Sequence, residues 1–330
     1  MDSVTQAALG AAIGEATLGK KIGSKGALYG ALVATVPDLD VILLPFFDDI
    51  QSLAVHRGFS HSILFSFIGA LFFVWLFKQM KTTAALTNTR LFIFSWLALV
   101  THMLLDAFTS YGTQLFLPFS NERVSFDSVC IVDPAYTLLL ITGVSVAVGM
   151  RKRNKTSWQF NAMGLVLSTM YLFAGLGVKS KVEDFVKAEL KEKQIAYTAI
   201  RSIPIAAGIS EWYCLAHDDD KLYLAKYSEL MEGKDFESFP IQNSLLDQVG
   251  PELGEAMRWF AQDFFTVQEE ADGQLLFYNL QCDMQGPRSV DGVRVPTAFY
   301  FRIDAQAEES MLSTGFHDVP QDQDLPAHSE

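Results

Sequence analysis

The sequence predicts a mostly α fold, in which a polytopic helical membrane domain of about five to six membrane helices precedes a small α+β extramembrane domain. The first observation behind this is composition, because 50% of the 330 residues are hydrophobic, 19% are charged and the mean hydropathy is +0.20. The second is uneven charge. Residues 1–178 carry 12 basic and 10 acidic side chains, whereas residues 179–330 carry 13 and 28. We therefore expect a membrane domain at 1–178, an acidic domain at 179–304 and a flexible acidic tail at 305–330.

The third observation is a series of apolar runs. In the first run, residues 3–18, Gly10 and Gly14 stand four apart and would let another helix approach closely. Residues 26–46 follow as a run of 21 residues, equivalent to about 31 Å of helix and enough to cross a bilayer. Pro37 and the aspartates after it interrupt this run, so we expect a broken helix that faces protein or a cavity. Four more runs are typical of membrane helices: residues 63–77, 91–107, 134–150 and 158–178.

Basic residues gather in alternate connections between these runs. The three clusters are Lys20–Lys25, Lys78–Arg90 and Arg151–Lys155. The positive-inside rule predicts that they lie in the cytoplasm. By alternation, the polar loop at 47–60, the loop at 108–131 and everything after residue 178 are expected on the non-cytoplasmic side.

After residue 178 the pattern is that of a water-exposed domain. Its expected elements are an amphipathic helix at 181–194, a hairpin of strands at 211–216 and 222–227, a helix at 251–264, and strands at 275–280 and 299–303. The excess of carboxylates excludes a nucleic-acid-binding surface, which needs clustered Lys and Arg.

Several chemically active residues are not expected to form sites. The aspartates 218–220 lack the alternating spacing of a calcium loop, so a solvated turn is expected. The histidines in polar surroundings are expected to stand alone, and they are His217, His317 and His328. The cysteines are too widely separated for a disulfide framework or a thiolate metal site, and they are Cys130, Cys214 and Cys282.

Histidines and carboxylates do gather within the apolar half of the chain. His102 and Asp106 are four apart in a helical run, which places both on one face. His56 and His61 flank Arg57, Gly58 and a serine, Ser60, that is placed to cap the next helix. Asp38 and Asp40 follow the helix break, so that one could bind a metal ion while the other holds a ligand histidine.

Taken alone, each of these pairs could have a purely structural role. The helical pair could be a polar contact between helices, the histidines could lie on the surface, and the aspartates could cap the broken helix. Taken together, all lie at the non-cytoplasmic ends of their runs and can meet in one place. Charged groups in apolar sequence cost about 2.5–3.5 kcal/mol each on insertion scales, and a shared metal ion would offset that cost.

The chain resembles a known family, the YdjM-type membrane-bound metal-dependent hydrolases of bacterial inner membranes. The segments that carry the resemblance are Met1–Gln6, Val36–Asp40, His56–Ser62 and Thr101–Asp106, which runs on to Phe108–Thr113. The resemblance covers about residues 1–178, and residues 179–330 look like an extension found in longer relatives. It implies a helical core distantly similar to that of the zinc-dependent phospholipase C superfamily.

The resemblance also implies metal ligands, namely Asp38, His56, His61, His102 and Asp106. Zinc is the expected ion and manganese the alternative. Many relatives carry Thr-His near the N-terminus where this chain has Thr5-Gln6, so a potential ligand is replaced by a neutral amide. One or two ions are therefore expected rather than a full multinuclear site.

The leading functional hypothesis is an integral inner-membrane hydrolase of a phosphoester or other ester at the outer face of the membrane, acting through metal-activated water. Asp40 would orient or deprotonate the water, and Arg57 would stabilise developing negative charge. Membrane lipids or lipid-linked compounds are the expected substrates. The alternative is a non-enzymatic scaffold or sensor with a structural metal and an acidic domain that binds an unknown protein partner. Transport is a third class, but the polar groups lie toward one side only.

Overall fold

The computed structural model describes residues 1–152, 156–205, 208–270, 273–282, 286–290, 293–304 and 311–317. Its contacts divide the chain into two compact units. Unit 1 contains Met1–Ile195 and Arg201–Cys214, and unit 2 contains Ala196–Ile200 and Leu215–Glu330. The boundary expected at residue 178 lies inside helix α7 (Trp158–Glu192), which is unbroken. The amphipathic helix expected at 181–194 is therefore the second half of α7.

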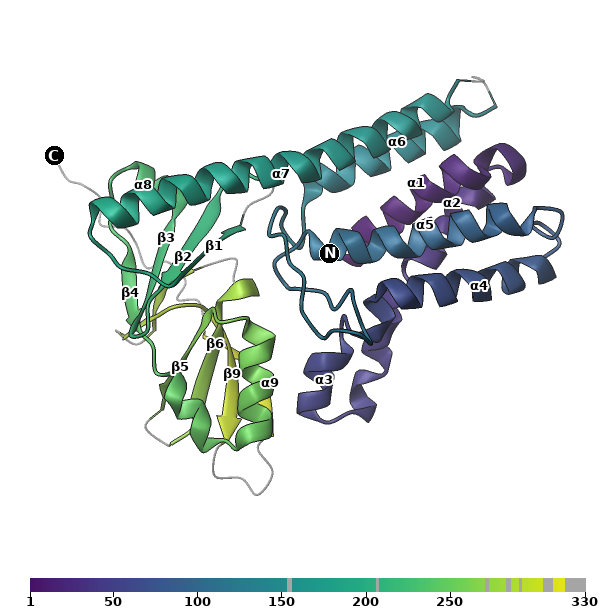
Figure 1. Cartoon of the computed structure of the whole chain (residues 1–330). Helices are drawn as coiled ribbons and strands as arrows, with labels where there is room; N and C mark the ends of the chain where they lie inside the picture. Colours follow the sequence, from purple (N-terminus) through teal and green to yellow (C-terminus); the bar gives the residue numbers. More distant parts are fainter. Residues whose placement is uncertain are drawn as a thin grey trace. The chain divides into compact units, whose positions relative to one another are not determined.

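Unit 1 is helical (Figure 1). Besides α7, its α-helices are α1 (Ser3–Ile22), α2 (Lys25–Ala34), α3 (Asp49–Val55), α4 (Ile63–Gln79), α5 (Asn88–Ala107) and α6 (Pro134–Met150). Three short 3₁₀ helices connect α2, α3 and α4, and they are η1 (Pro37–Ile42), η2 (Leu44–Phe46) and η3 (Phe59–His61). Helix α1 packs against α2, α5, α6 and α7 and so lies at the centre of the bundle.

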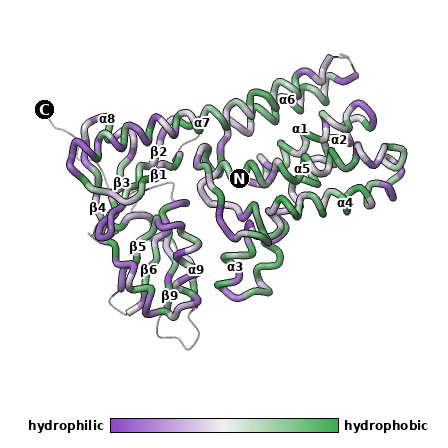
Figure 2. Tube along the Cα trace, in the orientation of Figure 1, coloured by the Kyte–Doolittle hydropathy of each residue, from purple (hydrophilic) through white to green (hydrophobic). Residues whose placement is uncertain are grey.

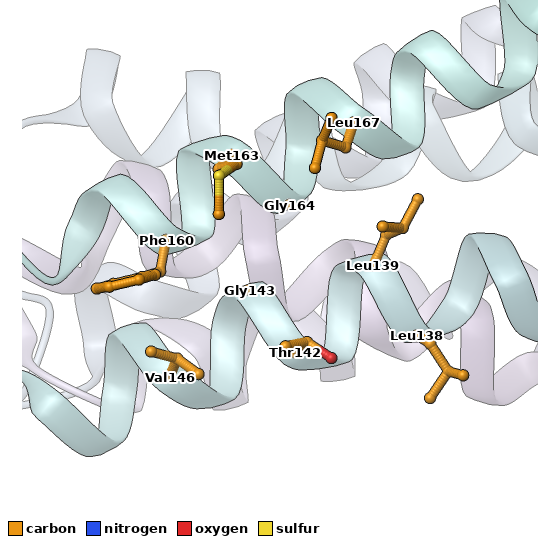
Figure 3. Close-up of a pocket in the computed structure, with 9 residues that line it drawn as sticks. All are labelled: Leu138, Leu139, Thr142, Gly143, Val146, Phe160, Met163, Gly164 and Leu167. Atoms are coloured by element: carbon orange, nitrogen blue, oxygen red, sulfur yellow. The ribbon is translucent and has the colours of Figure 1, made fainter.

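Glycines permit the closest helix contacts. A Cβ atom added to Gly30 would overlap the carbonyl oxygen of Gly10, and one added to Gly14 would overlap that of Gly26. The expectation that Gly10 and Gly14 admit a second helix is confirmed, and that helix is α2. Helices α6 and α7 approach in the same way, since a Cβ on Gly143 would lie 3.0 Å from the Cα of Gly164. Figure 3 shows an apolar pocket between α6 and α7, lined by Leu138, Leu139, Thr142, Gly143, Val146, Phe160, Met163, Gly164 and Leu167.

The apolar helices fit insertion into a membrane, and Figure 2 shows hydrophobic residues along α4 and α6. Among the described residues, α5 and α7 are each long and apolar enough to cross a bilayer, and α6 is a shorter apolar helix. Two bent pairs raise the number of candidate spans to as many as four: α2 with the segment Pro37–Phe46, bent by 46°, and Asp49–His61 with α4, bent by 56°. Length and composition thus support two to four spans, compared with the five to six expected. The break at Pro37 is confirmed.

The segment expected to be a polar loop at 47–60 is partly helical, because it contains α3 and η3. Asp48 caps α3 by accepting a hydrogen bond from the Gln51 amide at 2.7 Å. Helix α4 is capped by Ser62, which accepts from the Phe65 amide at 3.1 Å, and not by Ser60 as expected.

Strands dominate the remainder of the chain. One four-stranded sheet has the order β1 (Ala199–Pro204), β2 (Trp212–His217), β3 (Lys221–Lys226) and β4 (Glu237–Pro240). A second has the order β10 (Met311–Phe316), β9 (Phe299–Asp304), β6 (Leu275–Asn279) and β5 (Phe265–Glu269), and β7 (Arg288–Val290) pairs with β8 (Val293–Val295). The helices here are α8 (Tyr227–Met231), η4 (Asn243–Gln248), α9 (Pro251–Ala261) and η5 (Leu280–Cys282).

The hairpin expected around the aspartate turn is confirmed as β2 and β3, with Asp218 Oδ1 accepting from the Lys221 amide at 2.6 Å. The expected helix and two strands are confirmed as α9, β6 and β9. Part of the expected tail is ordered instead, because β10 pairs antiparallel with β9 and Leu312 lies opposite Ile303. His328 and residues 153–155 of the third basic cluster lie outside the described residues.

Strand β1 is tied to the long connection between α5 and α6 by a buried ion pair within unit 1. The Arg201 guanidinium donates to both carboxylate oxygens of Asp127, at 3.1 and 2.7 Å, and to the carbonyl of Ser110 at 3.0 Å. Lys179 on α7 donates to the same carboxylate at 2.9 Å. This network fixes the connection whose first residues lie beside the site described next.

Candidate metal centre

Four side chains from three elements converge at one end of unit 1. Asp38 comes from η1, His61 from η3, and His102 and Asp106 from one face of α5. Helix α5 supplies two because residues four apart on a helix project from the same face. Asp38 reaches the group because the chain leaves the direction of α2 at the break.

The nitrogen and oxygen atoms of this donor group lie close together. His61 Nε2 is 3.2 Å from His102 Nε2, 3.4 Å from Asp38 Oδ1 and 3.3 Å from Asp106 Oδ2. His102 Nε2 is 3.4 Å from Asp38 Oδ1 and 3.5 Å from Asp106 Oδ2. Three of the side chains are fully buried, and that of Asp38 is 20% exposed.

The donor group fits a cation. Two carboxylates this close together destabilise each other unless a positive charge lies between them. Among the described residues, Asp106 Oδ2, which faces both imidazoles, has no hydrogen-bond partner. Imidazoles and carboxylates are ligands for zinc and related divalent ions. Asp38, His61, His102 and Asp106 can therefore hold a metal ion.

Asp40 lies behind this group and holds the two histidines of the loop. Its Oδ2 is 3.3 Å from His61 Nδ1, and its Oδ1 is 3.2 Å from His56 Nδ1. It also accepts hydrogen bonds from Ser60 Oγ at 2.8 Å and from the Arg57 amide at 3.1 Å. A carboxylate on the far nitrogen of an imidazole fixes its tautomer and orientation, here with Nε2 of His61 toward the donors.

His56 does not join the donor group, although the sequence predicts it as a ligand. Its Nδ1 is directed at Asp40, and its ring packs edge-on against Tyr111, with 5.6 Å between centroids. The rings of His56 and His61 are 6.2 Å apart. The two histidines contact the two different oxygens of Asp40, which separates them. The structure thus brings together four of the five predicted ligands.

Arg57 is buried beside Asp106. One guanidinium nitrogen lies 3.5 Å from Asp106 Oδ1, and another donates to Thr109 Oγ1 at 3.1 Å. The Nε atom of Arg57 has no hydrogen-bond partner in the part of the chain that the structure describes. The backbone φ of Arg57 is 56°, in the left-handed region that non-glycine residues seldom adopt.

Gln6 contacts the group from α1, the first helix of unit 1. Its Nε2 donates to Asp106 Oδ1 at 3.0 Å and to the carbonyl of His102 at 3.2 Å. The nitrogen of Met1 lies 2.5 Å from the same carboxylate oxygen. Hydrogen-bond donors thus surround Asp106 Oδ1, whereas Asp106 Oδ2 is available to bind a cation.

Three residues of the α5–α6 connection complete the surroundings, and sequence reasoning assigned them no role. The ring of Tyr111 lies between two guanidinium groups, 4.7 Å from that of Arg57 and 4.9 Å from that of Arg123. Thr109 binds Arg57 as described. The polar, aromatic run at 109–113 could have indicated a role for Thr109 and Tyr111, but no spacing in the sequence indicates one for Arg123.

Comparisons with known proteins agree with the membrane character of unit 1. The profile of the family described as "YdjM inner membrane protein" matches residues 1–180. The "Uncharacterized protein YfhP" of Bacillus subtilis is 27% identical over 211 residues, covering 60% of this chain and 62% of that protein. The "Inner membrane protein YbcI" of Escherichia coli is 30% identical over 122 residues, covering 36% and 69%. No solved structure matches.

Proposed function

The chain belongs to the family of YdjM inner membrane proteins, and on this premise we propose that it is an integral inner-membrane, metal-dependent hydrolase of a phosphoester or other ester. The observation that supports the proposal is the donor group of Asp38, His61, His102 and Asp106, whose facing atoms lie within 4.8 Å of one another. This is a large concentration of ionisable groups for the end of an apolar helix bundle, where such groups are functional by default.

We propose zinc as the ion, because imidazoles and carboxylates are among its usual protein ligands. Five of the donor separations lie between 3.2 and 3.5 Å. In a tetrahedral site the ligands are separated by about 1.6 times the metal–ligand distance, which gives about 3.3–3.4 Å for zinc bonds of about 2.0–2.1 Å. Manganese stays the alternative.

When bound, the ion would supply Lewis acidity to a carbonyl or phosphoryl oxygen and would lower the pKa of a water molecule. Arg57 provides a permanently charged, planar donor for an anionic oxygen, and its unpartnered Nε leaves it capacity to bind one. Asp40 serves better as a positioning residue than as the base expected from the sequence, because His56, His61, Ser60 and the Arg57 amide already occupy its oxygens.

The metal requirement is tested with variants of two donors. Purified wild-type protein should contain close to one zinc ion per chain by mass spectrometry, and His61→Ala and His102→Ala should lose it, because each removes one of four ligands. His217→Ala, a histidine of unit 2 outside the group, is the matched control and should keep the metal. Gel filtration in detergent checks folding. A wild-type protein that stays metal-free after reconstitution would refute the metal site.

A structural metal is the second candidate, because four protein donors suffice to fill a tetrahedral zinc shell. The two candidate functions predict different effects of a substitution at Arg57, which does not belong to the metal-binding donor group. Under the hydrolase proposal, Arg57→Gln keeps its zinc but loses most hydrolysis of a panel of phosphoesters and carboxylic esters. If the zinc-loaded wild type cleaves nothing in that panel, and removal of zinc unfolds unit 1, the scaffold or sensor function is supported instead.

A further inference from the structure

A row of exposed apolar side chains lies directly beside the candidate metal centre. It occupies η1, η2 and the residue after them, and it is hereafter called the Leu39–Phe47 segment. The exposed members are Leu39, Val41, Ile42, Leu43, Phe46 and Phe47. Phe46 is 82% exposed and Ile42 is 61% exposed. Clustered exposure of this kind marks an interaction surface rather than a scatter of single residues.

The segment and the donor group share a backbone. Asp38 is a member of the donor group and Asp40 contacts His56, whereas the side chain of Leu39 between them is exposed. Asp38 is also the one donor of the four whose side chain is partly exposed. The accessible side of the donor group is therefore the side on which the apolar segment begins.

The depth of the donors in the bundle indicates what covers this segment. Helix α5 begins at Asn88, near the basic connection, so at 1.5 Å per residue His102 lies about 21 Å and Asp106 about 27 Å along it. The hydrocarbon core of a bilayer is about 30 Å thick, so a bundle inserted along α5 places the donors near its far boundary. Asp48 and Asp49, both exposed, follow the segment at once and mark the return to polar surroundings.

Exposed apolar side chains also occur on α4, a candidate membrane helix. Helix α4 begins two residues after His61, and it exposes Phe67, Ile68, Leu71, Phe72 and Trp75 by about half or more. These residues face lipid if α4 crosses the membrane, and no other occupant is needed for them.

We propose that the Leu39–Phe47 segment is immersed in the leaflet opposite the basic connections and opens the metal centre to the lipid phase. The substrate is then an amphiphile whose ester group reaches the donors from within the membrane, past Leu39 and Asp38. The substrate class rests on the proposed hydrolase function, whereas the immersion of the segment does not.

Immersion is tested by spin labelling in nanodiscs. Single cysteines are introduced as Ile42→Cys and Phe46→Cys, with Trp75→Cys on α4 as the lipid control and Met231→Cys on α8 as the water control. The wild type, labelled in parallel, reports the background. Burial raises the pKa of both Cys130 and Cys214 to about 12, so these thiols should react little near neutral pH.

Oxygen, which concentrates in lipid, should enhance the spin relaxation of the labels at 42 and 46 as strongly as that of the lipid control at 75. A water-soluble nickel chelate should enhance their relaxation several-fold less than that of the water control at 231. Accessibility to the chelate equal to that at 231 would overturn the proposal. So would protection from both agents, which would show that protein, such as a second copy of the chain, covers the segment. Neither readout depends on metal or hydrolysis.

The substrate class is tested with two esters that share one leaving group, one embedded in vesicles and one soluble in water. Phe46→Glu should lower hydrolysis of the embedded ester several-fold more than that of the soluble one, with zinc content unchanged. Met231→Glu is the matched control and should affect neither. Equal loss on both esters would overturn lipid-phase access, whereas no hydrolysis by the wild type would count against the proposed function itself.

Discussion

At the scale of single residues, Asp106 and Asp40 each direct their two carboxylate oxygens at different neighbours. Asp106 directs Oδ1 at Gln6 and Oδ2 at the two imidazoles. Asp40 divides its oxygens between His56 and His61. An ionised carboxylate without such partners would be costly at this depth in an apolar bundle.

Asp40 therefore affects metal binding without being a ligand. Asp40→Asn should weaken zinc binding by about 10–100-fold, because the amide orients His61 less firmly than the carboxylate does. Competition with a fluorescent zinc chelator measures the affinity. Asp48→Asn, an exposed aspartate that caps α3, is the control and should leave it unchanged. An unchanged affinity in Asp40→Asn would mean that the Asp40 carboxylate is dispensable for positioning.

At the scale of elements, one break and one close contact position the site. Helix α2 ends at Ala34, and Pro37, which lacks the amide proton that a continuing helix needs, begins η1; the bend of 46° between the two carries Asp38 into the donor group. The glycine contact between α1 and α2 holds the broken helix beside the start of α1, where Gln6 lies.

The glycine contact predicts a stability effect. Gly30→Ala should destabilise unit 1 by about 1–3 kcal/mol, because the added methyl group overlaps the backbone of Gly10 and the helices must separate. Gly149→Ala on α6 is the control, since nothing lies within 4 Å of its added Cβ. Thermal unfolding midpoints in detergent measure both. Equal midpoints would show that α1 and α2 can separate without cost.

At the scale of the whole molecule, unit 1 is polarised from end to end. Lys20 and Lys21 end α1, Lys78 ends α4, and Arg151, which follows α6, pairs with Glu15 and donates to the Gly19 carbonyl at 3.0 Å. The donor group lies at the opposite ends of these helices. We propose that the basic ends lie in the cytoplasm and that the chain after α7 lies on the other side of the membrane.

This orientation is checked with reporter fusions. Alkaline phosphatase fused after Glu330 should be active and green fluorescent protein fused there should be dark, because the positive-inside rule places that end outside the cytoplasm. Fusions after Lys81, in the connection between α4 and α5, should give the reverse. A fluorescent C-terminal fusion would invert the proposed topology.

The sequence by itself determined the apolar helices, the break at Pro37, the uneven charge and the placement of His102 and Asp106 on one helix face. These features are local, because hydropathy, a proline and a four-residue spacing act within one or two helical turns. Only the tertiary structure decided that His56 binds Asp40 rather than joining the donors, that Tyr111 and Arg123 flank Arg57, and that residues 311–316 form a strand. Such outcomes depend on which distant segments meet, and burial and hydrogen bonding choose among partners that no local spacing distinguishes.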